Sequence, residues 1–266
     1  MILDFSFWLF ALSALSGIIW LIDSWFLKPA RLRQQGLGTS ASPAALPEPI
    51  IVEYARSFFP VLLIVFLLRS FLFEPFRIPS ASMMPGLQAG DFIFVSKYSY
   101  GIRLPIINRT IIETGKPQRG DVIVFRLPHN PSVNYIKRLI GLPGDHIQVF
   151  NDQLFINGVS MAQQPAGLYS DEHYDSERLA TEDLGTVKHL VMFQTGYPPK
   201  DFDGVVPAGR YLFMGDNRDN SQDGRYQNEV GYVPDENLVG RAQLIWFNYV
   251  PWLNMPKFSR VGTRIH

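Results

Sequence analysis

Two long apolar stretches near the N-terminus dominate the hydrophobic pattern of the chain. Residues 5–22 read FSFWLFALSALSGIIWLI and contain no charge. This length is close to the roughly 20 residues that a helix needs to cross the hydrocarbon core of a bilayer. Residues 58–73 read FFPVLLIVFLLRSFLF with one charge, Arg69, near the end, where its side chain can reach the headgroups. The pattern therefore predicts two transmembrane segments, over residues 1–27 and 58–76.

Two other structures would give similar apolar stretches. A cleaved signal peptide is the alternative for the first stretch, but such a peptide begins with basic residues and has a shorter apolar part. Here Asp4 precedes the stretch, and the bulky Trp25 follows it. A buried core helix is the alternative for the second stretch, because Arg69 shortens its uncharged part.

The charges around these stretches predict their orientation. No Lys or Arg precedes the first stretch, whereas the connecting loop of residues 28–57 contains Lys28, Arg31, Arg33 and Arg56. Basic loops stay in the cytoplasm, so we expect this loop inside and both termini outside. The centre of the loop, residues 36–49, is rich in small residues and proline, which favours a flexible linker.

The remainder of the chain has the pattern of a β protein. Short runs rich in β-branched and aromatic residues alternate with turn-forming clusters, and long amphipathic helical patterns are scarce. Asn151-Asp152 separates two alternating runs and predicts a tight hairpin. We expect a mainly β, antiparallel-rich ectodomain whose core comprises residues 77–157 and 210–266, with residues 158–209 as an inserted second lobe. The predicted strands are 91–97, 121–127, 133–140, 145–150, 153–157, 187–193, 210–214 and 240–248.

Composition narrows the chemistry. The 266 residues include no cysteine, which excludes disulfides, cysteine nucleophiles and thiolate metal sites. The formal net charge of zero gives no support to a nucleic-acid partner. Neither an H-E-x-x-H pattern nor a G-x-S-x-G elbow nor a phosphate-binding loop is present. We therefore expect no metal and no cofactor, and the histidines to be surface or satisfied polar residues.

A Ser- and Pro-rich segment follows the second apolar stretch. Residues 74–95 read EPFRIPSASMMPGLQAGDFIFV and place Ser80 and Ser82 between two prolines. A simple turn is the alternative interpretation. However, the chain from Phe76 to Ser82 reaches at most about 20 Å, so a hydroxyl at Ser82 would stay close to the membrane face. A nucleophile there would reach only membrane-proximal peptide.

A lysine lies within a run that has the pattern of a buried strand. Alternation puts Lys137 on the same face as Tyr135 and Leu139. Burial disfavours the ammonium form and lowers the pKa of a lysine, which makes a neutral amine available as a general base. The alternative is that Lys137 points to solvent while Arg138 packs inwards.

Acidic and basic residues alternate in a third polar segment. Residues 213–226 read FMGDNRDNSQDGRY. A calcium loop is excluded because no glutamate stands where that loop needs its bidentate ligand. A solvated loop is the other alternative. The alternating charges favour a salt-bridged brace in which Ser221 can orient another group.

Together these segments resemble the sequence boxes of bacterial type I signal peptidase. IPSASMMPGLQAGD resembles its serine box, YIKRLIGLPGD its lysine box and GDNRDNSQDGRY its distal box, while RGDVIVF at residues 119–125 resembles a further box between the first two. Their order after two apolar stretches is also similar. The resemblance covers nearly all of residues 74–150 and 210–248.

The resemblance implies a membrane-bound serine endopeptidase that removes N-terminal signal peptides from exported preproteins after small residues of the Ala-x-Ala type. Ser82 matches the nucleophile and Lys137 the general base. The implied location is the bacterial cytoplasmic (inner) membrane, with the catalytic domain on the outer, periplasmic side. Signal peptides and the phospholipid bilayer are the implied partners, and functional association with the secretion translocon is compatible with this role.

The resemblance also implies supporting roles. Ser80 matches a hydroxyl that completes the oxyanion hole with the Ser82 backbone N–H, and Ser221 matches one that orients the lysine. Asp223 and Arg225 match a supporting ion pair. Met84 and Asp216 occupy matched positions without an assignable role. Matches to residues that line the pockets for small substrate side chains are Phe76, Ile78 and Tyr135.

The sequence departs from the family pattern at two points, and two other functions compete with this hypothesis. Many two-span relatives carry a cysteine pair that is absent here, and Gly224 replaces a bulkier small polar residue.

A self-cleaving repressor is another Ser–Lys protease, but such proteins are soluble and linked to DNA. A catalytically inactive, membrane-tethered β-domain that binds envelope partners is the non-enzyme alternative, against which the intact Ser82, Lys137 and Ser221 argue.

Overall fold

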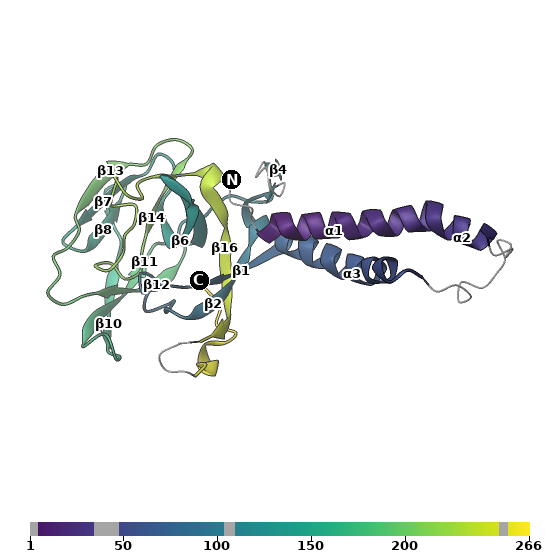
Figure 1. Cartoon of the computed structure of the whole chain (residues 1–266). Coiled ribbons are helices and arrows are strands. Elements are labelled where there is room, and N and C mark those ends of the chain that lie inside the picture. The colour runs from purple at the N-terminus through teal and green to yellow at the C-terminus, as the bar shows by residue number, and fades with distance from the viewer. Residues whose placement is uncertain (1–4, 35–47, 104–109, 250–254) are drawn as a thin grey trace. The chain divides into compact units, whose positions relative to one another are not determined.

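The computed structural model describes residues 5–34, 48–103, 110–249 and 255–266, and its contacts divide them into two units. The helices up to Leu72 belong to the first unit, and the strands from Phe73 onward belong to the second. Figure 1 labels these elements. Two apolar helical stretches are followed by a largely antiparallel β domain, so the predicted fold class is confirmed.

The first unit consists of two long helical stretches. Helix α1 (Phe5–Ile22) continues through a π-helical turn (Asp23–Leu27) into α2 (Lys28–Gln34). Helix α3 (Ile50–Leu67) continues through a second π-helical turn (Leu68–Leu72). Phe7–Arg33 and Ile50–Leu72 are long and apolar enough to cross a membrane. Within this unit α1 packs on α3 (Figure 1), with Phe10 against Phe66 and Trp20 against Phe59, both at ring-centroid distances of 5.7 Å.

The helices extend beyond the predicted segments into the loop expected at residues 28–57. Helix α2 continues to Gln34, and α3 begins at Ile50 rather than at residue 58. Glu53 and Arg56 interrupt the apolar run without interrupting the helix, because charged residues are good helix formers. The linker predicted at residues 36–49 lies outside the described residues except for Glu48 and Pro49.

The second segment also ends earlier than predicted. The sequence interpretation ran it to residue 76, whereas strand β1 (Phe73–Arg77) already pairs with β2 (Asp91–Ser96). Pro75 explains the difference, because proline inside a helix removes a hydrogen bond and clashes with the preceding turn. At the sheet edge the same residue is tolerated.

A seven-stranded antiparallel sheet carries the predicted catalytic segments. Its order is β1-β2-β16-β5-β6-β14-β15. Alternate positions on its strands supply two hydrophobic clusters: one contains Ile93, Val122 and Ile136, and the other contains Phe125, Leu139 and Phe213. The remaining strands of this sheet are β5 (Val122–Leu127), β6 (Asn130–Gly141), β14 (Arg210–Met214), β15 (Val233–Pro234) and β16 (Leu238–Asn248).

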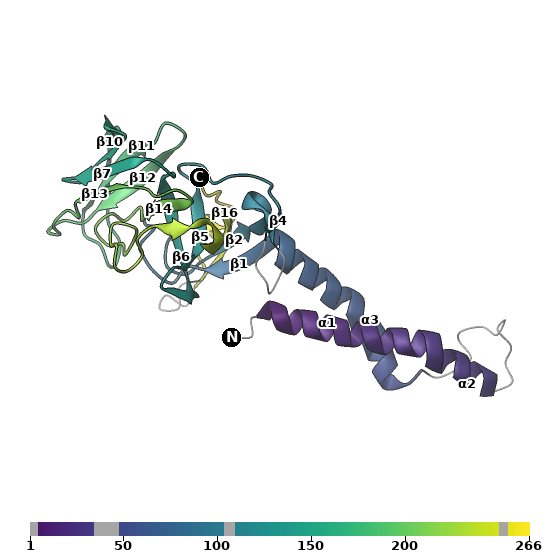
Figure 2. The same cartoon turned by 90° about the horizontal axis from the view of Figure 1, so that it is seen from above.

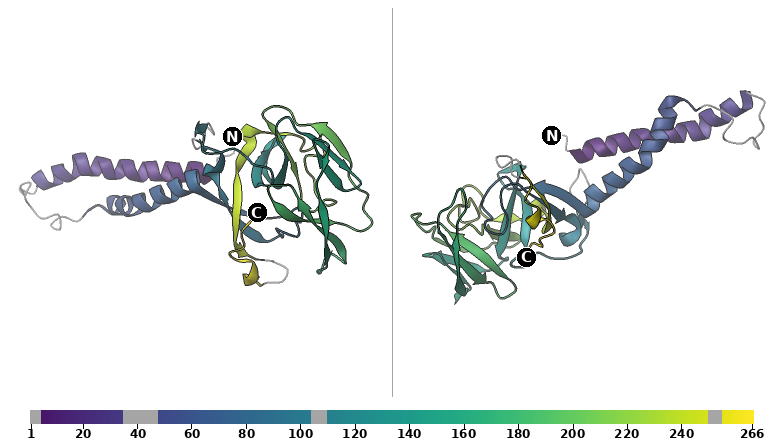
Figure 3. Two further views of the ribbon diagram at one scale, coloured as in Figure 1. Left: turned by 180° about the vertical axis from the view of Figure 1, so that it is seen from behind. Right: turned by 90° about the horizontal axis from the view of Figure 1, so that it is seen from below.

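Three smaller sheets complete the β domain. A four-stranded sheet has the order β13-β7-β8-β9, a three-stranded sheet the order β10-β11-β12, and a hairpin pairs β3 with β4. Figures 2 and 3 show the three- and four-stranded sheets together at one side of this domain. Their bounds are β3 (Ile102–Arg103), β4 (Thr110–Ile112), β7 (His146–Phe150), β8 (Gln153–Ile156), β9 (Val159–Ser160), β10 (Gln163–Tyr169), β11 (Glu177–Asp183), β12 (Lys188–Phe193) and β13 (Phe202–Val205).

The hairpin predicted at Asn151-Asp152 is confirmed. Phe150 pairs with Gln153, and the two turn residues have φ values of 49° and 66°. Both central positions of a type I′ turn need positive φ, which Asn and Asp tolerate better than most residues.

The predicted inserted lobe shares a sheet with strands outside it. Residues 158–209 contain strands β9 to β13, and β9 and β13 share a sheet with β7 and β8, which the sequence interpretation assigned to the core. The division of the β domain into a core and a lobe therefore stays a prediction. Strand β11, which was not predicted, reads ERLATED. Its residues alternate in burial, but most of them are polar, so the sequence does not show an alternation of apolar and polar residues.

Candidate active site

Ser82 lies in the loop that connects β1 to β2. The loop is closed at its base, because the Ile78 N–H donates to the Asp91 carbonyl (2.8 Å) and the Gly90 N–H donates to the Ile78 carbonyl (2.9 Å). Inside it, the Met84 N–H donates to the Ala81 carbonyl (3.1 Å). Ser82 is only 8% exposed. The serine-rich segment is thus an ordered, partly buried loop rather than a simple surface turn.

Lys137 lies on strand β6 and is only 4% exposed. Its Nζ donates to Ser82 Oγ at 2.6 Å and to the Ile136 carbonyl at 3.1 Å. It also lies 5.3 Å from the centre of the Tyr135 ring. The sequence left open whether Lys137 or Arg138 packs inwards. Both are buried, because strand β6 is covered on both faces from Ile136 to Gly141.

Burial changes the acid–base behaviour of this lysine. Loss of hydration disfavours the ammonium form and lowers the pKa of Lys137 to about 8, although the attraction of Asp223 and Asp216 acts in the opposite direction. An amine in this range is available in its neutral form near physiological pH. Together with the 2.6 Å contact, this places a suitable base next to the Ser82 hydroxyl.

Ser80 lies next to the candidate nucleophile. Its Oγ is 3.3 Å from Ser82 Oγ, and unlike Ser82 the residue is exposed. A hydroxyl here can turn toward a group that has reacted with Ser82. Met84, the matched position without an assigned role, is buried in the same loop.

Asp216, which the sequence left without a role, belongs to a row of buried polar side chains that contact one another. Arg138 makes a bidentate contact with its carboxylate, through Nε to Oδ1 at 2.8 Å and Nη2 to Oδ2 at 2.7 Å. The His189 ring lies 3.3 Å from Asp216 on one side and 3.3 Å from Glu182 on the other, and Glu182 pairs with Arg218. Burial acts to raise the pKa of Asp216, but the Arg138 guanidinium and the His189 ring hold it well below its usual range.

Asn217 is a residue of the site that the sequence analysis did not single out. Its backbone N–H donates to the Ser82 carbonyl (3.1 Å), and its side-chain Nδ2 donates to the Ala81 carbonyl (3.1 Å). Both contacts tie the distal polar segment to the backbone of the serine loop. The GDNRDN pattern pointed to a brace, but no spacing in the sequence indicates which of its side chains reaches the serine.

The Asp223–Arg225 ion pair that the resemblance implies is present in the structure. The contact between Ser221 and Lys137 that it also implies is not formed among the described residues. Arg225 Nε donates to Asp223 Oδ1 at 2.9 Å, and the Gly215 N–H donates to Asp223 Oδ2 at 2.9 Å. Ser221 Oγ is buried and meets hydrogen-bond geometry with none of the described residues, although it is close enough to Asp223 to contribute to lowering the pKa of that carboxyl. Lys137 Nζ instead donates to Ser82 Oγ and to the Ile136 carbonyl.

Two glycines allow this close packing. A Cβ at Gly215 would lie 2.5 Å from the Ser82 carbonyl oxygen and would also meet Ser221. A Cβ at Gly224 would lie 2.6 Å from Leu212 Cδ1 and 2.8 Å from the Phe213 carbonyl oxygen. The glycine that departs from the family pattern at position 224 therefore fits its surroundings, which leave no room for a side chain.

The residues matched to substrate pockets lie in two different hydrophobic clusters. Phe76 and Ile78 pack with Met83 and Leu87, whereas Tyr135 packs with Phe125 and donates from its hydroxyl to Gln222 Oε1 at 2.8 Å.

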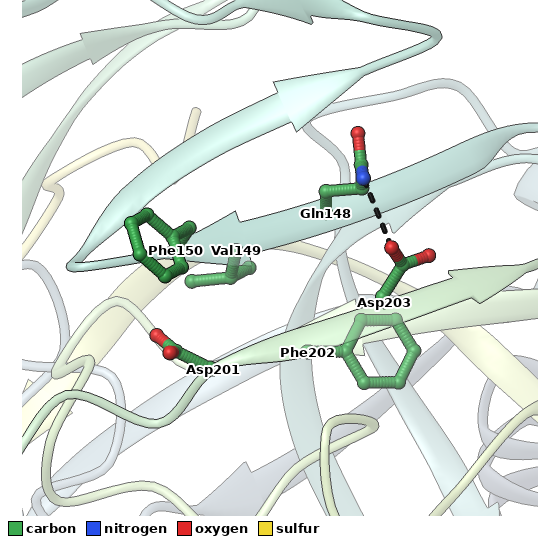
Figure 4. Close-up of a pocket in the computed structure, with 6 residues that line it drawn as sticks. All are labelled: Gln148, Val149, Phe150, Asp201, Phe202 and Asp203. Atoms are coloured by element: carbon green, nitrogen blue, oxygen red, sulfur yellow. Dashed lines mark hydrogen bonds between the residues drawn. The ribbon is translucent and has the colours of Figure 1, made fainter.

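A surface pocket of about 390 Å³ lies elsewhere, on strands β7 and β13 (Figure 4). It is lined by Gln148, Val149, Phe150, Asp201, Phe202 and Asp203. None of these lining residues belongs to the serine–lysine site.

The described residues contain no group of His, Asp or Glu side chains placed to hold a metal ion.

The chain is similar to known proteins over nearly its whole length. The family model described as "Signal peptidase, peptidase S26" matches residues 51–247. Signal peptidase I from Pseudomonas fluorescens is 47% identical over 98% of this chain and 99% of its own length, and signal peptidase I from Pseudomonas aeruginosa is 44% identical over the same shares. The crystal structure of a signal peptidase I from Enterococcus faecalis is 32% identical, with a TM-score of 0.32, and covers 47% of this chain and 96% of that chain.

Proposed function

The chain belongs to the signal peptidase family, peptidase S26, and from that premise we propose how its residues carry out the family's reaction. The protein is a hydrolase that cleaves signal peptides from exported preproteins. We propose that the cleaved bond follows small residues of the Ala-x-Ala type. The observation that carries the assignment of residues is the buried 2.6 Å contact between Lys137 Nζ and Ser82 Oγ.

In the proposed mechanism Ser82 Oγ attacks the carbonyl carbon of the scissile bond while neutral Lys137 accepts the hydroxyl proton. A serine hydroxyl is a weak nucleophile until a base takes this proton. The resulting Lys137 ammonium then gives the proton to the departing amine, and an acyl ester remains on Ser82. Water, deprotonated by Lys137, attacks that ester, and proton return to Ser82 completes the cycle.

The negative charge that develops on the carbonyl oxygen needs hydrogen-bond donors aimed at it. We assign this role to the Ser80 hydroxyl and the Ser82 backbone N–H. The 3.3 Å separation of the two hydroxyl oxygens supports Ser80 as a donor at this centre. Ser221 stays a proposed orienting residue for Lys137, since it is buried near Asp223 without making that contact here. Phe76, Ile78 and Tyr135 stay proposed pocket residues.

Cleavage as a function of pH tests this proposal. The full chain, solubilised in detergent, is mixed with a preprotein whose signal peptide ends in Ala-x-Ala, and the new N-terminus is identified by sequencing. Only neutral Lys137 can act as a base, so kcat/KM should be low in acid and rise as the pH passes about 8, the pKa of this lysine. A profile that rises through pH 6 to 7 and is flat above would indicate a different base, and a folded but inactive wild-type protein would favour the tethered β-domain.

We also propose that the protein lies in the bacterial inner membrane with the connecting loop in the cytoplasm. The basic loop and the two apolar helices support this orientation. Because the chain has no cysteine, the labelling of a single introduced cysteine can report the orientation of the protein in the membrane. A membrane-impermeant maleimide added to spheroplasts should label Ser259→Cys in the β domain and leave Gln34→Cys unlabelled. The reverse labelling would contradict the orientation. Translocon association stays a prediction.

A further inference from the structure

The last residues of the chain lie beside the strand that runs through the centre of the main sheet. Residues 258–266, here called the C-terminal segment, follow β16 and pair back onto it (Figures 1 and 3). The Ile245 N–H donates to the Thr263 carbonyl (2.9 Å), and the Ile265 N–H donates to the Gln243 carbonyl (2.9 Å). Strand β5 pairs with β16 only from Leu238 to Arg241, so this segment occupies the edge that β5 leaves.

From this position the C-terminal segment holds the base of the serine loop. Arg260 Nε and Nη2 donate to the two oxygens of Asp91, at 2.8 and 2.5 Å, and Nη2 also donates to the Gly86 carbonyl at 2.8 Å. Asp91 is fully buried, and its Oδ2 also accepts the Gln88 N–H at 2.8 Å. Arg260 thus bonds one peptide group of the loop that carries Ser82 directly, at Gly86, and is linked to a second, at Gln88, through Asp91.

Two further contacts extend this hold toward the reacting groups. Ile265 packs against the hydrophobic cluster that contains Ile78 and Met83, which lie on either side of Ser82 in the chain. The main-chain oxygen of His266 accepts from Arg138 Nη1 at 2.6 Å, and Arg138 is the neighbour of Lys137 on β6. The same short segment therefore contacts both the loop that carries Ser82 and the strand that carries Lys137.

We propose that the C-terminal segment is a clamp that positions Ser82 against Lys137, with Arg260 as its principal positioning residue. This inference rests on the proposed Ser–Lys mechanism. Arg260 does not touch the reacting atoms, so it acts through the loop. Its removal frees the Gly86 carbonyl, four residues from Ser82, and takes away the charged partner of Asp91, which holds the Gln88 N–H. Displacing a reacting group by about 1 Å can cost a factor of about 100 in rate.

The test compares Arg260→Ala with Arg264→Ala, a matched substitution at an exposed position of the same segment. The full chain in detergent cleaves the Ala-x-Ala preprotein at pH 6 to 10. In Arg260→Ala we expect kcat to fall roughly 10- to 100-fold at pH 7 with little change in KM. A looser loop also admits water to Lys137, so the acid limb of kcat/KM should move up by about 0.5 to 1 pH unit. Guanidinium ion at millimolar concentration should restore part of the rate, and Arg264→Ala should behave as wild type.

Three outcomes would overturn the clamp. The first is an Arg260→Ala variant that behaves as wild type. The second is an equal fractional loss of rate at every pH, which is the signature of partial unfolding alone. The third is a loss of rate that guanidinium does not restore. If Arg260→Ala does not fold, Arg260→Lys serves in its place. A lysine keeps the charge opposite Asp91 but cannot bond both carboxylate oxygens and Gly86, so the same shift of the acid limb is expected. An inactive wild-type protein would instead contradict the proposed function.

Discussion

Replacing Lys137 by alanine is expected to abolish cleavage of the Ala-x-Ala preprotein, with kcat lowered by roughly 10⁴-fold or more. Ser82→Ala should have an effect of the same size, because nucleophile and base act as one unit and neither is useful without the other. The measurement is single-turnover cleavage by the detergent-solubilised full chain. Lys188→Ala is the matched control, since Lys188 is an exposed lysine on β12 that pairs with Asp183.

The loss of activity must be separated from a loss of fold. Lys137→Met fills the same space without a charge. At pH 7, below its lowered pKa, the buried lysine must either give up its proton or remain charged without water, and both cost stability relative to the unfolded chain. We therefore expect Lys137→Met to unfold at the same temperature as the wild type or higher while staying inactive. Near-normal turnover in this variant or in Ser82→Ala would contradict the Ser–Lys assignment.

Arg138→Met is expected to lower the free energy of unfolding by about 3–5 kcal/mol, because it leaves the Asp216 carboxylate buried without its bidentate partner. Burial alone disfavours that charge, and the guanidinium is the principal group that compensates it. Urea unfolding of the full chain in detergent, followed by tryptophan fluorescence, measures the change.

Arg178→Met is the control for this substitution. Arg178 pairs with Asp152 at 3.1 Å, but its side chain is half exposed, so the pair should contribute no more than about 1 kcal/mol. Similar losses in the two variants would show that Asp216 is stabilised by groups other than Arg138. The double variant Arg138→Met with Asp216→Leu should recover much of the loss, since it removes the uncompensated charge as well.

The parts of the fold that could be predicted are the elements that a few neighbouring residues determine by themselves. The apolar helices, the strands around Lys137 and the Asn151-Asp152 hairpin each follow from periodicity or turn chemistry within a few residues. Strand β11 was missed because its alternation is carried by polar residues such as Glu182, which is buried only because Arg218 and His189 compensate it. The Arg218 guanidinium comes from 36 residues further along the chain, and no local pattern contains that contact.

The same distinction applies to the candidate site. That Ser82 and Lys137 lie together agrees with the resemblance of their segments to the serine and lysine boxes, whereas their roles in the reaction stay a proposal. The contacts of Asn217 with Ala81 and Ser82, and of Arg260 with Asp91, join segments more than 100 residues apart. They depend on how the strands are ordered in the sheet, and that order is set by pairing between distant segments rather than by local patterns.

Two cations on neighbouring positions of β6 make the function of the site depend on the pairing register of that strand. Lys137 and Arg138 project to opposite faces, one toward Ser82 and the other toward Asp216. A slip of the strand by one residue would exchange the faces of every side chain. It would put a guanidinium that cannot lose its proton beside the nucleophile, and a lysine with a single ammonium opposite a carboxylate that now receives two parallel hydrogen bonds. A misaligned chain would thus be both less stable and inert, so a half-folded protease would have no means of cutting its neighbours.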